Sequence, residues 1–291
     1  MSLVGHCHFP AAGSRVDLAV SGGPDSLGLL LLALDAGLRV TVHHVDHQAR
    51  AASGDDARFV VEFCESLGVA CQVHQVVVEG ADNFEARARA QRRRVLPEGT
   101  LTGHTMDDLA ETVLLNMMRG AGLDGLSPMV DDPTKPLRDL RRRELHDFVA
   151  AAGVTARLDE SNLSPRYRRN RVRAELVPLL NDVAGRDVVP LLARQAALVF
   201  ADRAWLDELA GHDAALELGR ADCRELRDWA PARLTRWLRR RLASDNGHGE
   251  TYPPSSEEID RALAVVRGDV VATELSGGRR LSRRGQHLAL E

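Results

Sequence analysis

Residues 16–26 read VDLAVSGGPDS, and this stretch decides the fold. The apolar, β-branched run from Val16 to Val20 is typical of a buried strand, and it stops at two glycines. A strongly apolar helix pattern begins at once, from Leu27 to Ala36. A strand, a tight loop and a helix N-terminus bring unpaired backbone N–H groups and the positive end of the helix dipole to one point. Such a point binds phosphate, so we predict a phosphate-binding loop here.

The spacing of the loop residues separates it from the two best-known phosphate loops. A Walker-type loop needs a lysine directly before its Ser or Thr. Here Asp25 precedes Ser26, and the only lysine of the chain is Lys135. The glycines are also wrongly spaced for a dinucleotide fingerprint of the form G-x-G-x-x-G. An ordinary strand–turn–helix corner stays open as the alternative, because Gly-Gly-Pro-Asp-Ser is common turn chemistry.

Short apolar strands alternate with helix patterns in the first part of the chain. Further strands are expected at residues 40–45, 69–78 and 100–103, and helices at 55–67, 84–96 and 106–118. This alternation predicts an α/β fold built on a doubly wound, mostly parallel sheet. Ligands of such sheets bind beyond the carboxyl ends of the strands, and the informative segments all fall at or just after strand ends.

The second part of the chain has a different pattern. Helices are expected at residues 141–152, in an Arg-rich segment that runs through Leu180, across 187–218 and at 257–267, and a small hairpin at 272–290. We therefore expect a first domain over residues 1–185. A smaller, mainly helical second domain should cover residues 186–291, beginning with a linker helix and ending in the hairpin.

The composition narrows the class of protein. The net charge of −4 excludes a chain that is basic as a whole, and no apolar run reaches the roughly 18–20 residues that span a bilayer. No basic segment followed by an apolar one opens the chain, so we do not expect export. Four scattered cysteines contain no Cys-x-x-Cys pair, which argues against a disulfide framework, a zinc ribbon and an iron–sulfur site. We expect a reducing, cytoplasmic location.

Residues 103–112 form the second informative segment. Asp108 and Glu111 lie three apart and Asp107 and Glu111 four apart, so in a helix either pair shares one face. Paired carboxylates there would recognise an ammonium group, Mg²⁺ or both. Simple stabilisation of a helix start by acids stays open. His104 ends a strand at the ligand-binding edge, where it could touch a phosphate or a leaving group, or be a neutral loop residue.

The strand end from His43 to His47 invites a metal interpretation. Imidazole and carboxylate are zinc ligands, but no fourth ligand follows at a familiar spacing. We instead expect this strand end, with Val45, to line the adenine and ribose of a nucleotide.

Residues 166–173 are the densest positive run. Five arginines, a tyrosine and an asparagine offer bidentate phosphate contacts, stacking and hydrogen bonds to base edges. In a chain of net charge −4 this local excess predicts a polyanionic partner. A solvated basic helix face is the alternative.

Taken together, these segments resemble the tRNA(Ile)-lysidine synthetase family, a branch of the ATP pyrophosphatases, which split ATP into AMP and pyrophosphate. The resemblance covers residues 15–180, in the family's order and spacing. It rests on Ser21, Gly22, Gly23, Pro24, Asp25, Ser26, His44, Val45, Asp46, His47, Arg50, Glu85, Ala88, Arg89, Arg92, His104, Asp107, Asp108, Glu111, Thr112, Arg119, Gly120, Pro136, Leu137, Arg142, Glu144, Asp159, Ser161, Asn162, Arg169, Asn170, Arg173 and Pro178. Many pyrophosphatases share the loop. The combination of Asp-Asp-x-x-Glu-Thr, Arg-Gly-x-Gly and Ser-Asn…Arg-Asn-x-x-Arg is much more specific.

The resemblance implies an adenine nucleotide alpha hydrolase-like fold and an ATP-dependent ligase, in which residues 1–185 are the catalytic domain and residues 186–291 the small substrate (tRNA)-binding domain. Such an enzyme adenylates the C2 carbonyl oxygen of the wobble cytidine in an isoleucine tRNA with a CAU anticodon. Free L-lysine then attacks C2 through its side-chain amine and expels AMP. Dimerisation is an expectation at the level of the family.

The resemblance also implies roles for individual residues. Pyrophosphate and nucleotide contacts would come from Ser21, Gly22, Gly23, Pro24, Asp25, Ser26, Val45 and His104, with Mg²⁺ at Asp25. Catalysis and the two charged ends of lysine would involve Asp25, Arg89, Asp108 and Glu111. Contacts to tRNA would come from Arg119, Arg169, Asn170 and Arg173.

Four positions depart from the family pattern. Arg93 stands in place of tyrosine, Leu109 in place of glutamine, Lys135 in place of arginine and Arg138 in place of leucine. These departures concern local packing and some tRNA contacts, and not the chemistry.

Other functions stay open on the sequence. The chain could be another PP-loop tRNA-modifying or amidating ATP pyrophosphatase. The thiolase that acts on tRNA cytidines would require a Cys-x-x-Cys site, which this sequence lacks. An amidating synthetase would require a source of ammonia. A protein that only senses adenine nucleotides and binds RNA is the non-enzymatic alternative.

Overall fold

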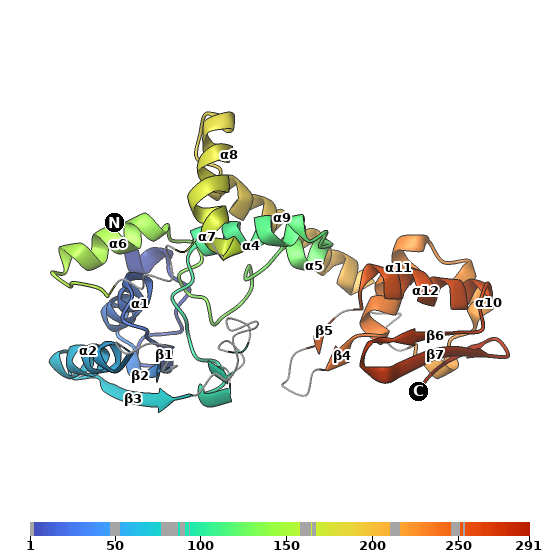
Figure 1. Cartoon of the computed structure of the whole chain (residues 1–291), viewed down its shortest axis with the longest axis horizontal. Coiled ribbons are helices and arrows are strands. Elements are labelled where there is room, and N and C mark those ends of the chain that lie inside the picture. The colour runs from blue at the N-terminus through green and yellow to red at the C-terminus, as the bar shows by residue number, and fades with distance from the viewer. Residues whose placement is uncertain are drawn as a thin grey trace. The chain divides into compact units, whose positions relative to one another are not determined.

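The computed structural model describes most of the chain and divides it into two compact units, Met1–Phe200 and Ala201–Glu291 (Figure 1). The residues described are 3–46, 53–76, 87, 91–92, 94–157, 164, 167–209, 216–245, 251–252 and 254–291. The boundary between the two units falls within a long helix, α9 (Val189–Leu209). The domain division at residues 185 and 186 stays a prediction.

A parallel sheet of three strands forms the base of the first unit. The strands β1 (Arg15–Ala19), β2 (Arg39–Asp46) and β3 (Ala70–Gln75) pair in the order β1-β2-β3. Leu18 of β1 also forms an isolated parallel bridge with Leu101, so the strand predicted at residues 100–103 is reduced to a single bridge. Helices join the strands, and this arrangement confirms the predicted α/β fold with a parallel sheet.

Helix α1 (Pro24–Asp35) lies at the centre of the first core. Leu27, Leu29, Leu30 and Leu32 are all buried, as the apolar pattern predicts for a helix packed on several sides. A Cβ added at Gly28 would lie 2.4 Å from Leu145 Cδ1, so this glycine lets α6 approach α1 closely. Around α1 lie η1 (Leu3–His6), α2 (Ser53–Ser66) and α6 (Arg142–Ala151).

A second group of helices completes the first unit. It consists of α4 (Met106–Met118), α5 (Leu123–Leu126), α7 (Arg168–Arg171), a π-helical turn η3 (Val172–Leu176), α8 (Val177–Ala184) and the start of α9. The apolar side of α4 packs on two partners: Leu109 and Val113 contact α9 around Ala196, and Leu115 contacts η3 at Val172. The bounds of α4 are those predicted.

The second unit has a core of its own. It is built from the end of α9, η5 (Leu218–Arg220), α10 (Cys223–Arg227), α11 (Pro231–Arg241), β4 (Ser244–Asp245), β5 (Thr251–Tyr252), α12 (Ser256–Arg267), β6 (Ala272–Leu275), η6 (Ser276–Gly278), β7 (Arg279–Arg284) and β8 (His287–Leu290). Trp237, Ile259 and Leu281 are buried at its centre. The predicted hairpin forms, and β8 adds a third antiparallel strand to it.

The described helices and the four cysteines bear on membrane insertion and on disulfide bonds. None of the described helices combines the length and the apolar character that crossing a bilayer requires. All four cysteines lie within the described part of the chain, and each is a free thiol.

Candidate active site

The loop predicted to bind phosphate has a shape that its own hydrogen bonds fix. Gly22 has a φ of 87°, which favours glycine, and Pro24 opens α1 directly after the extended N-cap Gly23. The Ser26 hydroxyl donates to the Gly23 carbonyl oxygen at 2.9 Å and accepts from the Ser21 backbone N–H at 3.1 Å. The glycines are thereby held directly before the first turn of α1, where the backbone N–H groups of Ser26 and Leu27 donate to the Gly23 carbonyl oxygen.

The second predicted segment starts against this loop. A Cβ added at Gly103 would lie only 2.5 Å from the carbonyl oxygen of Asp25. Only glycine therefore allows the chain to pass this close to the first turn of α1. Three residues later α4 begins, so the acids of α4 lie beside the loop, as their position after a strand end predicts.

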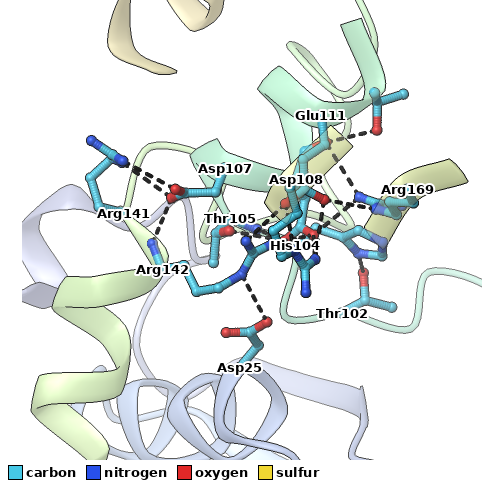
Figure 2. A network of polar contacts seen from close by, with 12 residues as sticks. Asp25, Thr102, His104, Thr105, Asp107, Asp108, Glu111, Arg141, Arg142 and Arg169 are labelled. Atoms are coloured by element: carbon cyan, nitrogen blue, oxygen red, sulfur yellow. Dashed lines mark hydrogen bonds and ion pairs between the residues drawn. The ribbon is translucent and has the colours of Figure 1, made fainter. Parts of the chain in front are cut away.

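Asp25 connects the loop to a set of charged side chains (Figure 2). Its Oδ1 lies 2.8 Å from His146 Nε2, and its Oδ2 lies 3.6 Å from Arg142 Nε. Among the described residues, the buried Arg142 Nε has no hydrogen-bond partner. Asp25 is thus the one loop residue whose side chain reaches across to α6.

Asp108 and Glu111 lie one turn apart on α4 and are both buried. Arg142 joins them: its Nη2 donates to Asp108 Oδ1 and its Nη1 to Glu111 Oε1, each at 2.8 Å (Figure 2). The other oxygen of Asp108 accepts from the Thr105 backbone N–H at 2.8 Å. Asp108 therefore caps α4 with one oxygen and faces the arginines with the other, and its predicted role in binding an ammonium group or Mg²⁺ stays a prediction. Asp107 turns to Arg141 instead.

Arg169 and Arg173, predicted as contacts to RNA, bind the same two acids. Arg169 donates to Glu111 Oε2 at 2.9 Å and to Asp108 Oδ1 at 3.0 Å. Arg173 donates to both oxygens of Glu111, at 2.8 and 3.1 Å. We call these five residues, Asp108, Glu111, Arg142, Arg169 and Arg173, the acid–arginine centre.

Asp108 and Glu111 are charged at neutral pH. Burial would raise the pKa of Asp108, but the charges of Arg142 and Arg169 lower it to about 2. Burial likewise opposes a low pKa at Glu111, and the hydrogen bond from Arg173 brings the pKa below its ordinary value. Burial works against the charge of Arg142, yet Asp108 and Glu111 raise its pKa. Such carboxylates bind cations well but accept protons poorly.

His104 is an uncharged neighbour of the centre. Burial lowers its pKa to about 4, and its Nδ1 lies 2.7 Å from the Thr102 hydroxyl (Figure 2). It is therefore neutral at pH 7 and can exchange hydrogen bonds with a phosphate or a leaving group without adding charge.

The strand end of β2 is held by histidines. His43 lies 2.8 Å from Asp17 Oδ1 and 2.9 Å from His74 Nε2, and His44 Nδ1 lies 2.8 Å from the Val20 carbonyl oxygen. The part of the chain that the structure describes contains no group of three or more potential metal-binding side chains. Val45 follows, half-buried, near the carboxyl end of β2.

Two predicted tRNA contacts lie outside the acid–arginine centre. Arg119 is the exposed C-cap of α4, at the end opposite the acids. Asn170 donates from Nδ2 to the Ser164 carbonyl oxygen at 2.9 Å, so it holds the start of α7.

Some motif residues fall outside the described residues. Arg89 is one of them, together with His47, Arg50, Glu85, Ala88, Asp159, Ser161, Asn162 and the departure at Arg93. The other departures have local partners. Leu109 is buried against α9, Lys135 Nζ donates to the Thr134 hydroxyl at 2.8 Å, and Arg138 donates to the Asp132 carbonyl oxygen at 3.2 Å.

The sequence interpretation missed His146 and gave Arg142 no role. The two lie four apart in α6, which puts them on one helix face, and this spacing is the signal that could have been used. It also missed Arg141, which holds Asp107 with two bonds of 3.1 Å and pairs with Asp187.

Comparisons with known proteins give matches over most of the chain. Residues 4–180 match a family model described as a PP-loop domain. The chain is 34% identical over 273 residues to a tRNA(Ile)-lysidine synthase of Nocardia farcinica, covering 90% of this chain and 85% of that one. The same name belongs to relatives in Thermobifida fusca (35% identity, 92% and 89% covered) and Mycolicibacterium paratuberculosis (42%, 72% and 67%).

A solved structure is similar in fold. It is a U34-tRNA thiolase NcsA from Methanococcus maripaludis with its [4Fe-4S] cluster, at a TM-score of 0.51 and 19% identity. The match covers 65% of this chain and 73% of that one. At this identity the likeness supports the α/β fold alone.

Proposed function

Because this chain belongs to the tRNA(Ile)-lysidine synthase family of PP-loop proteins, we propose the reaction that it catalyses on its tRNA. It is an ATP-dependent ligase that forms lysidine. It joins free lysine to C2 of the wobble cytidine in an isoleucine tRNA with a CAU anticodon, and it releases AMP and pyrophosphate. The observation that carries the proposal is the direct connection of the glycine loop, through Asp25 and Arg142, to the buried acids of α4.

The first step activates the cytidine. The C2 carbonyl oxygen attacks the α-phosphate of ATP, and pyrophosphate leaves from the loop of Ser21 to Ser26. The glycine loop and the positive end of the α1 dipole would stabilise the charge that develops on the leaving group. His104, neutral beside the loop, would donate to a phosphate oxygen, and Val45 would contact the adenine.

Asp25 fits a magnesium site. Mg²⁺ usually takes one or two carboxylates together with substrate phosphates. The Asp25 side chain is 32% exposed, and no donor lies within hydrogen-bonding distance of its Oδ2 among the described residues. The ion, when bound to Asp25, would neutralise negative charge on the departing pyrophosphate.

The second step brings lysine to the activated cytidine. We assign Asp108, Glu111 and Arg89 to the two charged ends of lysine. The ammonium group has an ordinary pKa of about 10.4 and must lose a proton before it attacks C2. Because the pKa of Asp108 is about 2, this carboxylate would hold the ammonium group and would not take its proton.

Lysine and tRNA should bind in a linked manner. Arg169 and Arg173 cover the acids, with side chains that are 33% and 36% exposed, whereas Arg142 is only 14% exposed. If RNA phosphates draw Arg169 and Arg173 away, Asp108 and Glu111 become available to the lysine ammonium group. We therefore propose that tRNA binds before lysine.

The tRNA is read where it is single-stranded. An unpaired anticodon cytidine can be turned into a pocket and recognised on its edges. Arg119, Arg169, Asn170 and Arg173 would position the RNA, and the second unit would contribute further contacts. We also propose a cytoplasmic location and a homodimer, as expected of the family.

The decisive assay combines the intact chain with ATP, Mg²⁺, labelled lysine and a transcript of the isoleucine tRNA with a CAU anticodon. Label should enter this tRNA together with one AMP for each lysine. A methionine tRNA transcript, which has the same anticodon, is the matched control and should stay unlabelled. If the isoleucine transcript also stays unlabelled, the lysidine assignment is wrong.

A further inference from the structure

A groove opens at the end of α4 that lies away from the acids. Its volume is about 460 Å³, and it lies between the last turns of α4 and the segment α7–η3–α8. The groove belongs entirely to the first unit, and all of its lining residues are described. Neither the pyrophosphate loop nor the acid–arginine centre contributes a side chain to it.

The floor of the groove is apolar. Leu115, Val172 and Leu176 pack together at its base, and Met118 and Leu179 form its open sides. Met118 is 61% exposed and Leu179 is 56% exposed, although both are large apolar side chains. An apolar floor with exposed rims suits a flat, partly apolar ligand such as a nucleobase.

The rim of the groove is positively charged. Arg119, Arg168 and Arg171 line it, against a single acid, Glu175. Arg171 is bound to Glu175 by bonds of 2.8 to 3.1 Å. Within the described chain, the side chains of Arg119 and Arg168 form no hydrogen bond or ion pair with another residue. Two guanidinium groups therefore flank an apolar floor and can bind a phosphate bidentately.

The groove and the acid–arginine centre lie on the same face of α4. Asp108, Glu111, Leu115 and Met118 follow the spacing of one helix stripe on α4. The rise of the helix places Arg119 about 12 Å beyond Glu111 along its axis. The segment α7–η3 contributes to both sites. Arg169 and Arg173 bind the acids. Arg168 and Val172 line the groove.

The wall of the groove is a π-helical turn, Val172–Leu176. Pro178 follows it in α8. Because proline has no backbone N–H, it cannot donate to the carbonyl oxygen four residues earlier, and the α-helical hydrogen-bond pattern is interrupted here. Turns of this kind are rare and occur frequently at functional sites. This observation is independent of the charges.

From this geometry we propose that the groove binds an unstacked nucleotide of the RNA substrate, next to the modified cytidine. The base lies on the floor formed by Leu115, Val172 and Leu176, and its phosphate lies between Arg119 and Arg168. The proposal rests on the proposed function, because it takes the substrate to be an anticodon loop. Charge complementarity favours RNA over an apolar protein surface as the occupant.

The test measures binding of RNA to the intact chain without ATP or lysine. The probes are a CAU anticodon stem–loop and two versions with an abasic site, one on each side of the wobble cytidine. One abasic version should bind the unaltered protein about tenfold more weakly, because the contact of one base with the apolar floor is lost. Leu179→Asp, which puts a carboxylate into the groove, should bind the intact stem–loop about tenfold more weakly and no longer distinguish the abasic version.

Val183→Asp is the matched control. It lies in α8, is 78% exposed and does not line the groove, so it should bind all three RNAs like the unaltered protein. The proposal is overturned if neither abasic site weakens binding, or if Leu179→Asp binds like the control. It is also overturned if Leu179→Asp changes the oligomeric state in light scattering while RNA affinity is unchanged, since the groove would then be a contact between two copies.

The failure of this proposal is distinguishable from failure of the proposed function. Without lysine incorporation, the lysidine assignment fails whatever the stem–loop binds. With normal lysine incorporation and identical binding of all three RNAs, the groove proposal alone fails.

Discussion

The two ends of α4 use the same basic side chain in opposite ways. At the N-terminal end, three arginines are held by the buried carboxylates of Asp108 and Glu111. At the C-terminal end, Arg119 is exposed, and no described acidic side chain pairs with it. A paired arginine can bind a polyanion only by leaving its acid, whereas an unpaired arginine is available to a polyanion directly. The difference lies in the partners and not in the residue type.

Removing the charge of Glu111 should have the largest effect on this comparison. Glu111→Gln leaves three guanidinium groups around a side chain that is 2% exposed. We expect the free energy of unfolding in urea to fall by about 3–5 kcal/mol, because breaking a buried ion pair leaves uncompensated charge. At the other end of α4, Glu175→Gln breaks only an exposed pair with Arg171 and should cause little change. Equal losses in both variants would erase the distinction.

Asp25→Ala should separate chemistry from RNA binding. Asp25 connects the loop to the N-terminal end of α4 and has no contact with the groove. We expect AMP formation to fall about 100- to 1,000-fold, as when one charge-stabilising group is lost, while the affinity for tRNA is unchanged. Asp35→Ala, an exposed position at the end of the same helix, is the control. Loss of tRNA affinity in Asp25→Ala alone would contradict this division of labour.

His104 makes the acidic end of α4 sensitive to pH. The unfolded chain binds a proton on this side chain near pH 6.5, but the folded chain does so only near pH 4. The unfolded state therefore binds more protons between these values, and the free energy of unfolding falls as the pH drops from 6.5 to 4. The loss should be about 3 kcal/mol. Urea titrations of His104→Gln should lack this component.

Asp108 makes the free energy of unfolding depend on pH in a second, lower pH range. Its folded pKa of about 2 is below the ordinary value of 3.8, so it stabilises the fold above about pH 4 and loses this contribution as the pH falls towards 2. Asp108→Asn should remove the change in this window only. If both variants follow the pH profile of the unaltered protein, the assigned protonation states are wrong.

Release of the paired arginines by RNA can be measured through lysine binding. If tRNA draws Arg169 and Arg173 from the acids, calorimetry should find lysine bound about tenfold more tightly in the presence of the isoleucine tRNA transcript. Arg171→Ala, which removes an arginine that does not touch the acids, should leave this difference intact. Equal lysine affinity with and without tRNA would refute the linked binding.

The smallest effect is expected at the unpaired end. Arg168→Ala should weaken binding of the anticodon stem–loop moderately and reduce the slope of log affinity against log salt concentration by about 1, as for one lost phosphate contact. Arg143→Ala on α6, also exposed but remote from the groove, should leave the slope unchanged. An unchanged slope in Arg168→Ala would show that this end of α4 does not meet a phosphate.

Local patterns predicted the loop and the acids well. The sequence from Val16 to Ser26 determines its own strand, turn and helix start, and the bounds of α4 follow from one helix period. The rule that ligand sites gather at the carboxyl ends of parallel strands then brought both segments together. Each of these steps depends on residues that are close in the sequence.

The partners of the arginines could not be predicted in the same way. Arg142 and Arg169 reach Asp108 across 34 and 61 residues, so their pairing depends on how α6 and α7 pack and not on any local pattern. His146 reaches Asp25 across 121 residues. A dense arginine run predicts a polyanion equally well whether its members face solvent or buried acids. Only the tertiary structure separates Arg168 from its neighbour Arg169.

The π-helical turn at Val172–Leu176 also bears on how this segment can change in evolution. A π turn holds one residue more than an α turn, so deleting one residue inside it would leave a regular α turn and keep α7 and α8 in register. An insertion or deletion within α7 or α8 would instead turn the residues beyond it by about 100°, so that Arg169 and Leu179 could no longer serve their separate neighbours. The spacing of these residues is itself a functional property.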